Sequence, residues 1–177
     1  MSRVKVAQLA QALPAVACLA LIFWFSSQTY GEQTIVPLLR RHISEFRLSG
    51  MLPDISFRYG HSLLSAKQAP YQFIEFLFRK GAHVFWYALL CASLYIALRS
   101  LPRLAPRALL RLSTAAALLA TAACLDEWNQ ARVAGRTGQP IDVLLDVVGG
   151  LLATAIVLAV ARAIRSARRK SIMKEGV

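Results

Sequence analysis

The sequence predicts an all-α protein, a four-helix transmembrane bundle with a long extracytoplasmic loop that carries an amphipathic helix. Of the 177 residues, 56% are hydrophobic and only 17% are charged, whereas a soluble domain carries about 25% charged residues. Four apolar stretches reach or approach the roughly 20 residues that cross a bilayer as a helix. These stretches are apolar on all faces, while the helices of a soluble bundle keep a polar stripe.

The predicted spans cover residues 6–25, 80–98, 104–125 and 141–161. The first span resembles a secretory signal, but Phe25 would occupy the −3 position of a cut after Ser27, so we predict an uncleaved helix. Gly81, near the start of the second span, is a candidate helix break. Residues 1–162 are therefore predicted to form the membrane domain, and residues 163–177 a basic cytoplasmic tail.

The distribution of lysine and arginine predicts the orientation of the bundle. The net charge is +12. If the N-terminus is cytoplasmic, twelve basic residues lie inside, in the N-terminal segment, the short connection around residues 99–111 and the tail, against nine outside. Short connections count most in the positive-inside rule, so both termini are predicted to be cytoplasmic. Basic residues placed beside membrane spans do not indicate a nucleic-acid partner.

The first loop, residues 26–79, is too long for a simple connector. Its apolar residues recur at helical spacing up to Gly50, with basic and acidic residues between them. This pattern predicts an amphipathic helix that either rests on the outer membrane surface or packs over the bundle as a lid. Both interpretations stay open at this point. The apolar residues of the pattern are Ile35, Leu38, Leu39, Ile43 and Phe46.

Ionisable residues gather near the predicted outer ends of three spans. Charged groups inside a membrane are costly and therefore need a partner or a function. Residues three and seven positions apart share a helix face, and the topology brings the three span ends to the same membrane surface. We therefore predict one outward-facing polar pocket. It combines Lys80, His83 and Tyr87 of the second span, Asp126, Glu127 and Gln130 of the third, and Asp142 and Asp146 of the fourth, with Arg136 in the loop above.

These residue types suggest acid–base chemistry beside an anion-binding group. A histidine with carboxylate partners can transfer protons, and lysine and arginine bind anionic head groups. No HExxH or comparable string is present, so no metal site is predicted; a divalent ion on the four carboxylates is the less favoured alternative. No cofactor is inferred. The predicted catalytic residues are His83, Asp126, Glu127 and Asp146, and the predicted substrate-binding residues are Lys80, Tyr87, Gln130, Arg136 and Asp142.

Three motifs resemble those of the VanZ-like family of bacterial integral membrane proteins. They are Ser26-Ser27-Gln28, the Lys-x-x-His-x-x-x-Tyr pattern of residues 80–87, and a C-terminal signature over residues 126–149. Asn129 stands where the family often has histidine, and Trp86 where an acidic residue is common. The resemblance implies a polytopic protein of the bacterial cytoplasmic membrane with a role in the cell envelope, including resistance to glycopeptide antibiotics.

The leading functional hypothesis is therefore a site that binds, and in its stronger form modifies, an anionic envelope component. The expected partner is a membrane lipid or a lipid-linked envelope precursor. The alternative is a non-enzymatic scaffold or accessory subunit whose polar cluster fixes helix packing, because four carboxylates balanced by nearby cations can also hold helices together. A proton or ion pathway is disfavoured, since the ionisable residues stop in the outer half of the spans.

Overall fold

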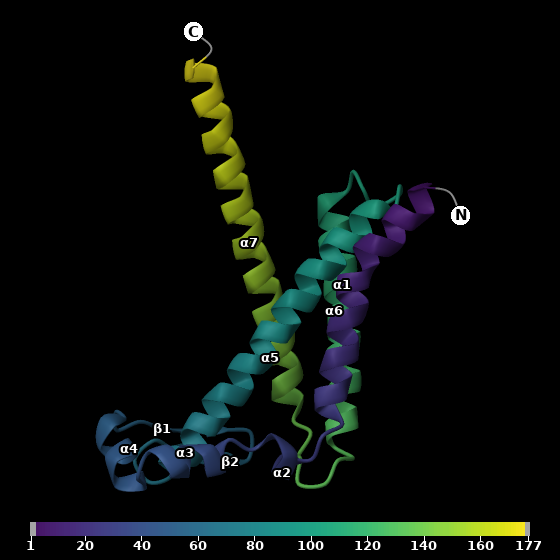
Figure 1. Ribbon diagram of the computed structural model, residues 1–177. Helices are drawn as coiled ribbons and strands as arrows, with labels where there is room; N and C mark the ends of the chain where they lie inside the picture. Colours follow the sequence, from purple (N-terminus) through teal and green to yellow (C-terminus); the bar gives the residue numbers. More distant parts are fainter. Residues whose placement is uncertain (1–2, 176–177) are drawn as a thin grey trace.

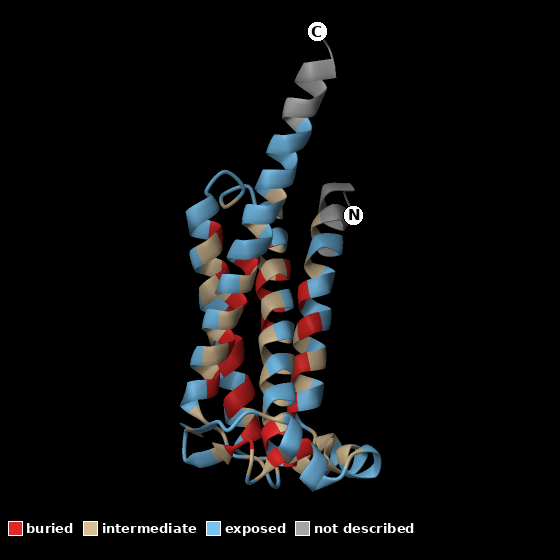
Figure 2. Cartoon of the chain, turned by 90° about the vertical axis from the view of Figure 1, so that its left-hand side faces the viewer, coloured by how far each residue is buried: buried red, intermediate tan, exposed pale blue. Residues whose placement is uncertain are grey.

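Four long helices dominate the chain and form one bundle, from which the C-terminal part of the last helix extends (Figures 1 and 2). The computed structural model describes the backbone of residues 3–175 and the side chains of residue 8 and residues 10–168. Helices account for 74% of the residues, as the sequence predicts. The long helices are α1 (Arg3–Ser26), α5 (Pro70–Ala97), α6 (Ala108–Gln130) and α7 (Pro140–Glu175).

The four helices share one core, in which α5 packs against each of the other three. The core of buried residues comes from α1, α5 and α6, and partly buried residues of α7 cover it. Gly150 of α7 allows a close approach, because a Cβ there would lie 2.8 Å from a methyl carbon of Leu119 and 3.0 Å from the carbonyl oxygen of Tyr87. Small residues at such crossings are typical of helix packing in membranes.

Large apolar side chains also cover the outside of the bundle, including Leu118 of α6 and Leu152 and Ile156 of α7. This surface is suited to lipid, since soluble proteins rarely expose apolar patches of this extent. Three described helical segments are long and apolar enough to cross a membrane: Pro70–Ser100, Ala108–Gln130 and Pro140–Arg168. A fourth candidate combines Ala10–Ser26 with Tyr30–His42, which are bent by 116° at the break between them.

The helix bounds differ from the predicted spans. Helix α5 begins at Pro70, ten residues before the expected span, and Gly81 does not break it. Proline suits this first helical position because it lacks an amide hydrogen that would have no partner there. Helix α6 begins at Ala108 and runs to Gln130, so the acidic string lies in its last turns. The predicted tail continues α7 to Glu175. The structure does not describe the side chains of five basic residues near the two ends, which are Arg3, Lys5, Arg169, Lys170 and Lys174.

The predicted amphipathic helix is two helices, α3 (Val36–His42) and α4 (Glu45–Met51). Ile43 is extended, and Ser44 starts α4 as its N-cap by accepting a hydrogen bond from the Arg47 amide; serine favours this position over a helix interior. Both helices pack against α5. The loop also holds the short helix α2 (Tyr30–Gln33) and an unpredicted antiparallel hairpin of β1 (Ser56–Tyr59) and β2 (Ser62–Ser65).

These small elements all lie at one end of the bundle, where α1 and α6 end and α5 and α7 begin (Figure 1). A short 3-10 turn, η1 (Leu98–Ser100), follows α5 at the opposite end. Buried residues line the inner faces of the helices and gather again beneath the small elements (Figure 2). The end that carries the loop is therefore where polar side chains of different helices are enclosed.

Candidate functional site

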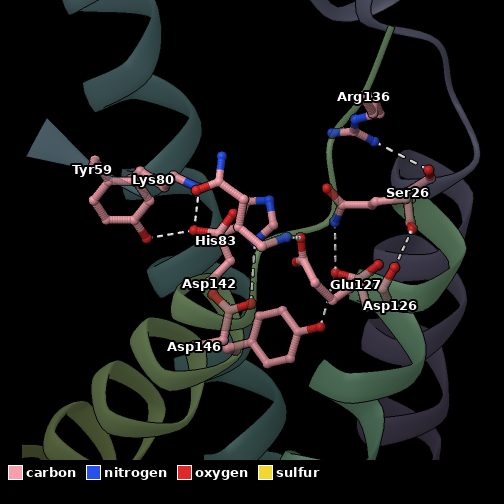
Figure 3. Close-up of polar contacts among 12 residues, drawn as sticks. Ser26, Tyr59, Lys80, His83, Asp126, Glu127, Arg136, Asp142 and Asp146 are labelled. Atoms are coloured by element: carbon pink, nitrogen blue, oxygen red, sulfur yellow. Dashed lines mark hydrogen bonds and ion pairs between the residues drawn. The ribbon is translucent and has the colours of Figure 1, made fainter. Parts of the chain in front are cut away.

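The polar residues of three helices meet at the loop-covered end of the bundle (Figure 3). Helix α5 contributes Lys80, His83 and Tyr87, helix α6 contributes Asp126, Glu127 and Gln130, and helix α7 contributes Asp142 and Asp146. The four carboxylate residues of α6 and α7 are buried. The convergence expected from topology and helix spacing is thus present in the structure.

Lys80 and Asp142 form an ion pair between α5 and α7. The Lys80 Nζ lies 2.5 Å from an Asp142 carboxylate oxygen, and both side chains are mostly buried. Tyr59 of β1 donates a hydrogen bond to the same oxygen, and its ring lies 4.8 Å from the Lys80 Nζ. Burial, together with this hydrogen bond, raises the pKa of Tyr59, so the phenol stays protonated. The hairpin is therefore tied to the start of α7 through a residue that the sequence analysis did not select.

His83 and Tyr87 stack and reach different carboxylates. The His83 Nδ1 lies 3.2 Å from an Asp146 oxygen, and the two rings are 6.3 Å apart and nearly parallel. The Tyr87 hydroxyl donates to Asp126 over 3.0 Å, and Gln130 donates to the same Asp126 oxygen over 3.0 Å. When Asp146 accepts from Nδ1, the Nε2 of a neutral His83 keeps its lone pair, which is the arrangement of a general base.

Glu127 holds the connection between α6 and α7. One of its carboxylate oxygens accepts a hydrogen bond from the Gln139 amide over 2.5 Å, immediately before α7 starts. Gly138 passes so close to α6 that a Cβ would lie 2.8 Å from the Glu127 carbonyl oxygen. This contact positions the loop, and the other Glu127 carboxylate oxygen is buried without a hydrogen-bond partner among the described residues.

Arg136 points toward the end of α1. Its guanidinium donates to the carbonyl oxygens of Phe25 and Ser26 over 3.1 Å each, to that of Gln28 over 3.4 Å, and to the Gln33 side chain over 2.9 Å. The last carbonyl groups of a helix have no partner within the helix and attract cations. Burial, and after it the charge of Arg79, lowers the pKa of Arg136. Most of its hydrogen-bonding capacity is therefore used within the protein.

Arg79 is the cation that the sequence analysis left out of the site. It packs over the ring of Tyr30, 5.5 Å from the centroid, and Tyr30 in turn donates to the buried Glu75 over 2.6 Å. Within the part of the chain that the structure describes, its guanidinium makes no hydrogen bond and no ion pair. Lys80, the next residue, has an ion-pair partner. The sequence does not predict this difference, because adjacent helix residues face different neighbours.

Two cavities flank Arg79 and His83. The first, of about 390 Å³, lies between α1, α5 and the end of α6. Phe25, Phe78 and Trp86 give it an aromatic wall. Its charged lining residues are Glu32, Arg79, Asp126 and Arg136. The second, of about 280 Å³, lies beneath the hairpin and α2 and is bounded by polar side chains of α5 and the α6–α7 loop. Arg79, His83, Gln130 and Arg136 line both cavities.

The loop elements that cover these cavities lie outside the predicted amphipathic segment. Helix α2 and the hairpin line them, whereas neither α3 nor α4 does. Instead, Phe46 of α4 is 90% exposed, and Met51 and Leu38 are also exposed. The covering segment at this end is thus α2 with the hairpin, and the predicted amphipathic segment lies beside it.

Ser26, the last residue of α1, and Ser27 after it belong to the same network. Asn129, at the position where the resembled family often has histidine, donates to the hydroxyls of Ser26 and Ser27 over 3.0 and 3.2 Å. Ser26 donates to the Asp126 carbonyl oxygen over 3.3 Å. Trp86 packs against Phe25, with ring centroids 6.2 Å apart. Both departures from the family pattern are therefore accommodated by contacts between α1 and its neighbours.

Comparison with known proteins agrees with the family resemblance of the motifs. The chain has no significant match among curated proteins or among solved structures. A family model described as VanZ/LLP1 matches residues 12–162, which include α5 and α6, parts of α1 and α7, and every residue of the site. The chain is a membrane protein that belongs to the VanZ-like family.

Proposed function

We propose that the protein binds the phosphate-bearing head group of an anionic lipid or lipid-linked envelope precursor in the cavity between α1 and α5. The observation that carries the proposal is the chemistry of this cavity. Aromatic residues line it together with Arg79, whose guanidinium has no hydrogen bond or ion pair among the described residues. A lipid requires both, an apolar surface for its chain and a positive group for its phosphate.

The exposed aromatic residues supply a path for the chain. Phe25 and Phe78 are 36% and 60% exposed, so they face both the cavity and the surroundings of the bundle. In a bilayer these surroundings are acyl chains. A lipid head group can therefore enter the cavity from the membrane while its acyl chain stays among other lipids. No apolar surface of the lipid is then exposed to water, which would be unfavourable.

The proposed orientation places the site at the outer surface of the bacterial cytoplasmic membrane, with both termini in the cytoplasm. The basic residues of the opposite end support it, among them Arg99, Arg103 and Arg162. Exposed Phe46 and Met51 would then rest on the outer leaflet. A reporter fused after Arg103 tests the orientation: a cytoplasmic signal agrees with it, and an extracytoplasmic signal contradicts it.

The test of head-group binding is lipid retention by the purified protein. Native mass spectrometry should show that the detergent-purified chain retains phosphatidylglycerol or a polyprenyl phosphate in preference to phosphatidylcholine. Arg79→Gln removes the guanidinium that faces the cavity, and a charge-assisted hydrogen bond is worth about 1.5–3 kcal/mol. The preference should therefore fall by about tenfold or more.

Arg132→Gln is the matched control. Arg132 is an exposed arginine at the same end of the chain, packed over Trp128 and absent from both cavities. It should keep the wild-type preference. Equal retention of anionic and zwitterionic lipid by the wild type, or an unchanged preference in Arg79→Gln, contradicts the proposal. Whichever of the two phosphate lipids is retained more strongly identifies the source of the head group.

A structural role for part of the cluster is supported by separate contacts. Lys80 is paired with Asp142, and Arg136 is bound to the end of α1. The scaffold alternative therefore describes these two cations better than it describes Arg79, although Arg136 also lines both cavities. If binding leads to turnover, His83 with Asp146 behind it is the group that would transfer a proton.

A further inference from the structure

We propose that His83, Asp126 and Asp146 bind a divalent transition-metal ion such as Zn²⁺ or Mn²⁺. One ligand atom from each of these residues lies within 4.8 Å of the others. Ligands bind such ions at about 2.0–2.2 Å, so two ligands of one ion lie roughly 3–4 Å apart. The His83 Nδ1 and an Asp146 oxygen lie 3.2 Å apart, and a metal ion bound by both would replace the proton that this hydrogen bond holds.

Unpartnered buried oxygens are the second, independent observation. Asp126 and Asp146 are only 2% and 1% exposed, and each has one carboxylate oxygen without a hydrogen-bond partner. Across the described residues, every buried carboxylate oxygen that lacks a partner belongs to Asp126, Asp146 or the adjacent Glu127. Burying an unpaired charged oxygen is costly. A cation at this place supplies the missing partner.

The charge around the cluster favours the same conclusion. Lys80 is held by Asp142, so the carboxylates of Asp126 and Asp146 have no lysine or arginine side chain in ion-pair contact within the described part of the chain. A divalent ion would balance both. The imidazole favours a transition metal over Ca²⁺ or Mg²⁺, which prefer oxygen ligands alone.

Hydrogen bonds would orient these ligands. Tyr87 and Gln130 both donate to one oxygen of Asp126, which leaves its other oxygen for the ion. Such outer partners fix the geometry of metal ligands and often matter nearly as much as the ligands. This inference deepens the proposed function, because a cation beside the cavity that Arg79 and Asp126 line would be a second contact for a phosphate head group.

The test measures metal content without any lipid. The full-length protein, stripped with a chelator, is dialysed against Zn²⁺ or Mn²⁺ alone, and the bound metal is counted by mass spectrometry. We expect about one equivalent per chain and a higher thermal unfolding midpoint with metal, because a ligand that binds only the folded state stabilises it. Less than about a tenth of an equivalent of either metal overturns the inference.

Two substitutions distinguish the loss of a metal ligand from the loss of a negative charge near the site. Asp146→Asn removes a proposed ligand, whereas Asp142→Asn removes the same charge one turn earlier on α7, from a residue outside the proposed set. The first should lose the metal and the second should keep it. Equal loss in both overturns the assignment. If Asp146→Asn does not fold, His83→Gln replaces it in the comparison. Arg79→Gln should retain full metal content, so failure of lipid binding and failure of metal binding are read separately.

Discussion

Replacing Lys80 with methionine should lower the free energy of unfolding by about 2–3 kcal/mol. The change leaves the carboxylate of Asp142 buried without its ion-pair partner, and breaking a buried pair from one side generally costs about 3–5 kcal/mol. The value expected here is smaller because Tyr59 still donates to the same oxygen and because Lys80 is 19% exposed. Denaturant unfolding in detergent micelles measures the difference.

Removing the partner as well should restore much of the stability. In the double variant Lys80→Met with Asp142→Leu, no buried charge remains at this position, and apolar replacements of buried pairs are often neutral. Asp142→Leu alone should destabilise the fold, since it leaves the Lys80 ammonium without its partner. A double variant that is as unstable as the sum of the two single variants would show that the pair is not coupled.

Replacing Arg136 with alanine should have an effect of similar size, about 2–4 kcal/mol, at a different place. It removes donors from three carbonyl oxygens at the end of α1 and from Gln33. Hydrogen bonds from a charged donor contribute about 1.5–3 kcal/mol each, and they are not additive when one side chain makes them all. Denaturant unfolding of the purified variant measures the loss.

Lysine at this position should restore little of the stability. The guanidinium reaches several acceptors at once through its planar fork, whereas an ammonium group is a point charge on a flexible stem. Arg132→Ala is the control, because this exposed arginine contacts Trp128 and lies outside the network. If Arg136→Lys is as stable as the wild type, or Arg136→Ala as stable as Arg132→Ala, Arg136 does not hold α1 in the way described.

Much of the bundle and its polar end follows from local patterns. Apolar runs of sufficient length predict the helices, and the spacing of Lys80, His83 and Tyr87 places them on one side of α5. The three span ends then meet, because alternating spans bring them to one surface. No long-range contact has to be known for this inference, and the positions of Asp126 and Asp142 opposite α5 follow from connectivity alone.

The partners within the cluster do not follow from such patterns. Tyr59 contacts Asp142 across 83 positions, and Arg136 reaches Ser26 across 110. The hairpin that carries Tyr59 has four-residue strands, too short for an alternating pattern to stand out. A glycine-flanked arginine predicts a turn, but it does not predict which acceptor lies within reach.

The difference between Arg79 and Lys80 is also a tertiary property. Neighbouring helix positions point about 100° apart, so Lys80 reaches Asp142 while Arg79 does not and lines both cavities. Which of them is paired depends on where α7 lies. The placement of α3 and α4 is a tertiary property as well. Their amphipathic pattern predicts that one face is covered, but it does not predict whether the membrane or the bundle covers it.

Filling the cavity between α1 and α5 tests the proposed binding most directly. Ala82 lines this cavity, and Ala82→Trp places an indole where the head group would lie. Ile96→Trp, at an exposed position near the other end of the same helix, is the control. The measurement is retention of phosphatidylglycerol against phosphatidylcholine by native mass spectrometry. We predict that Ala82→Trp loses the anionic preference and that Ile96→Trp keeps it; a wild-type preference in folded Ala82→Trp would contradict the account.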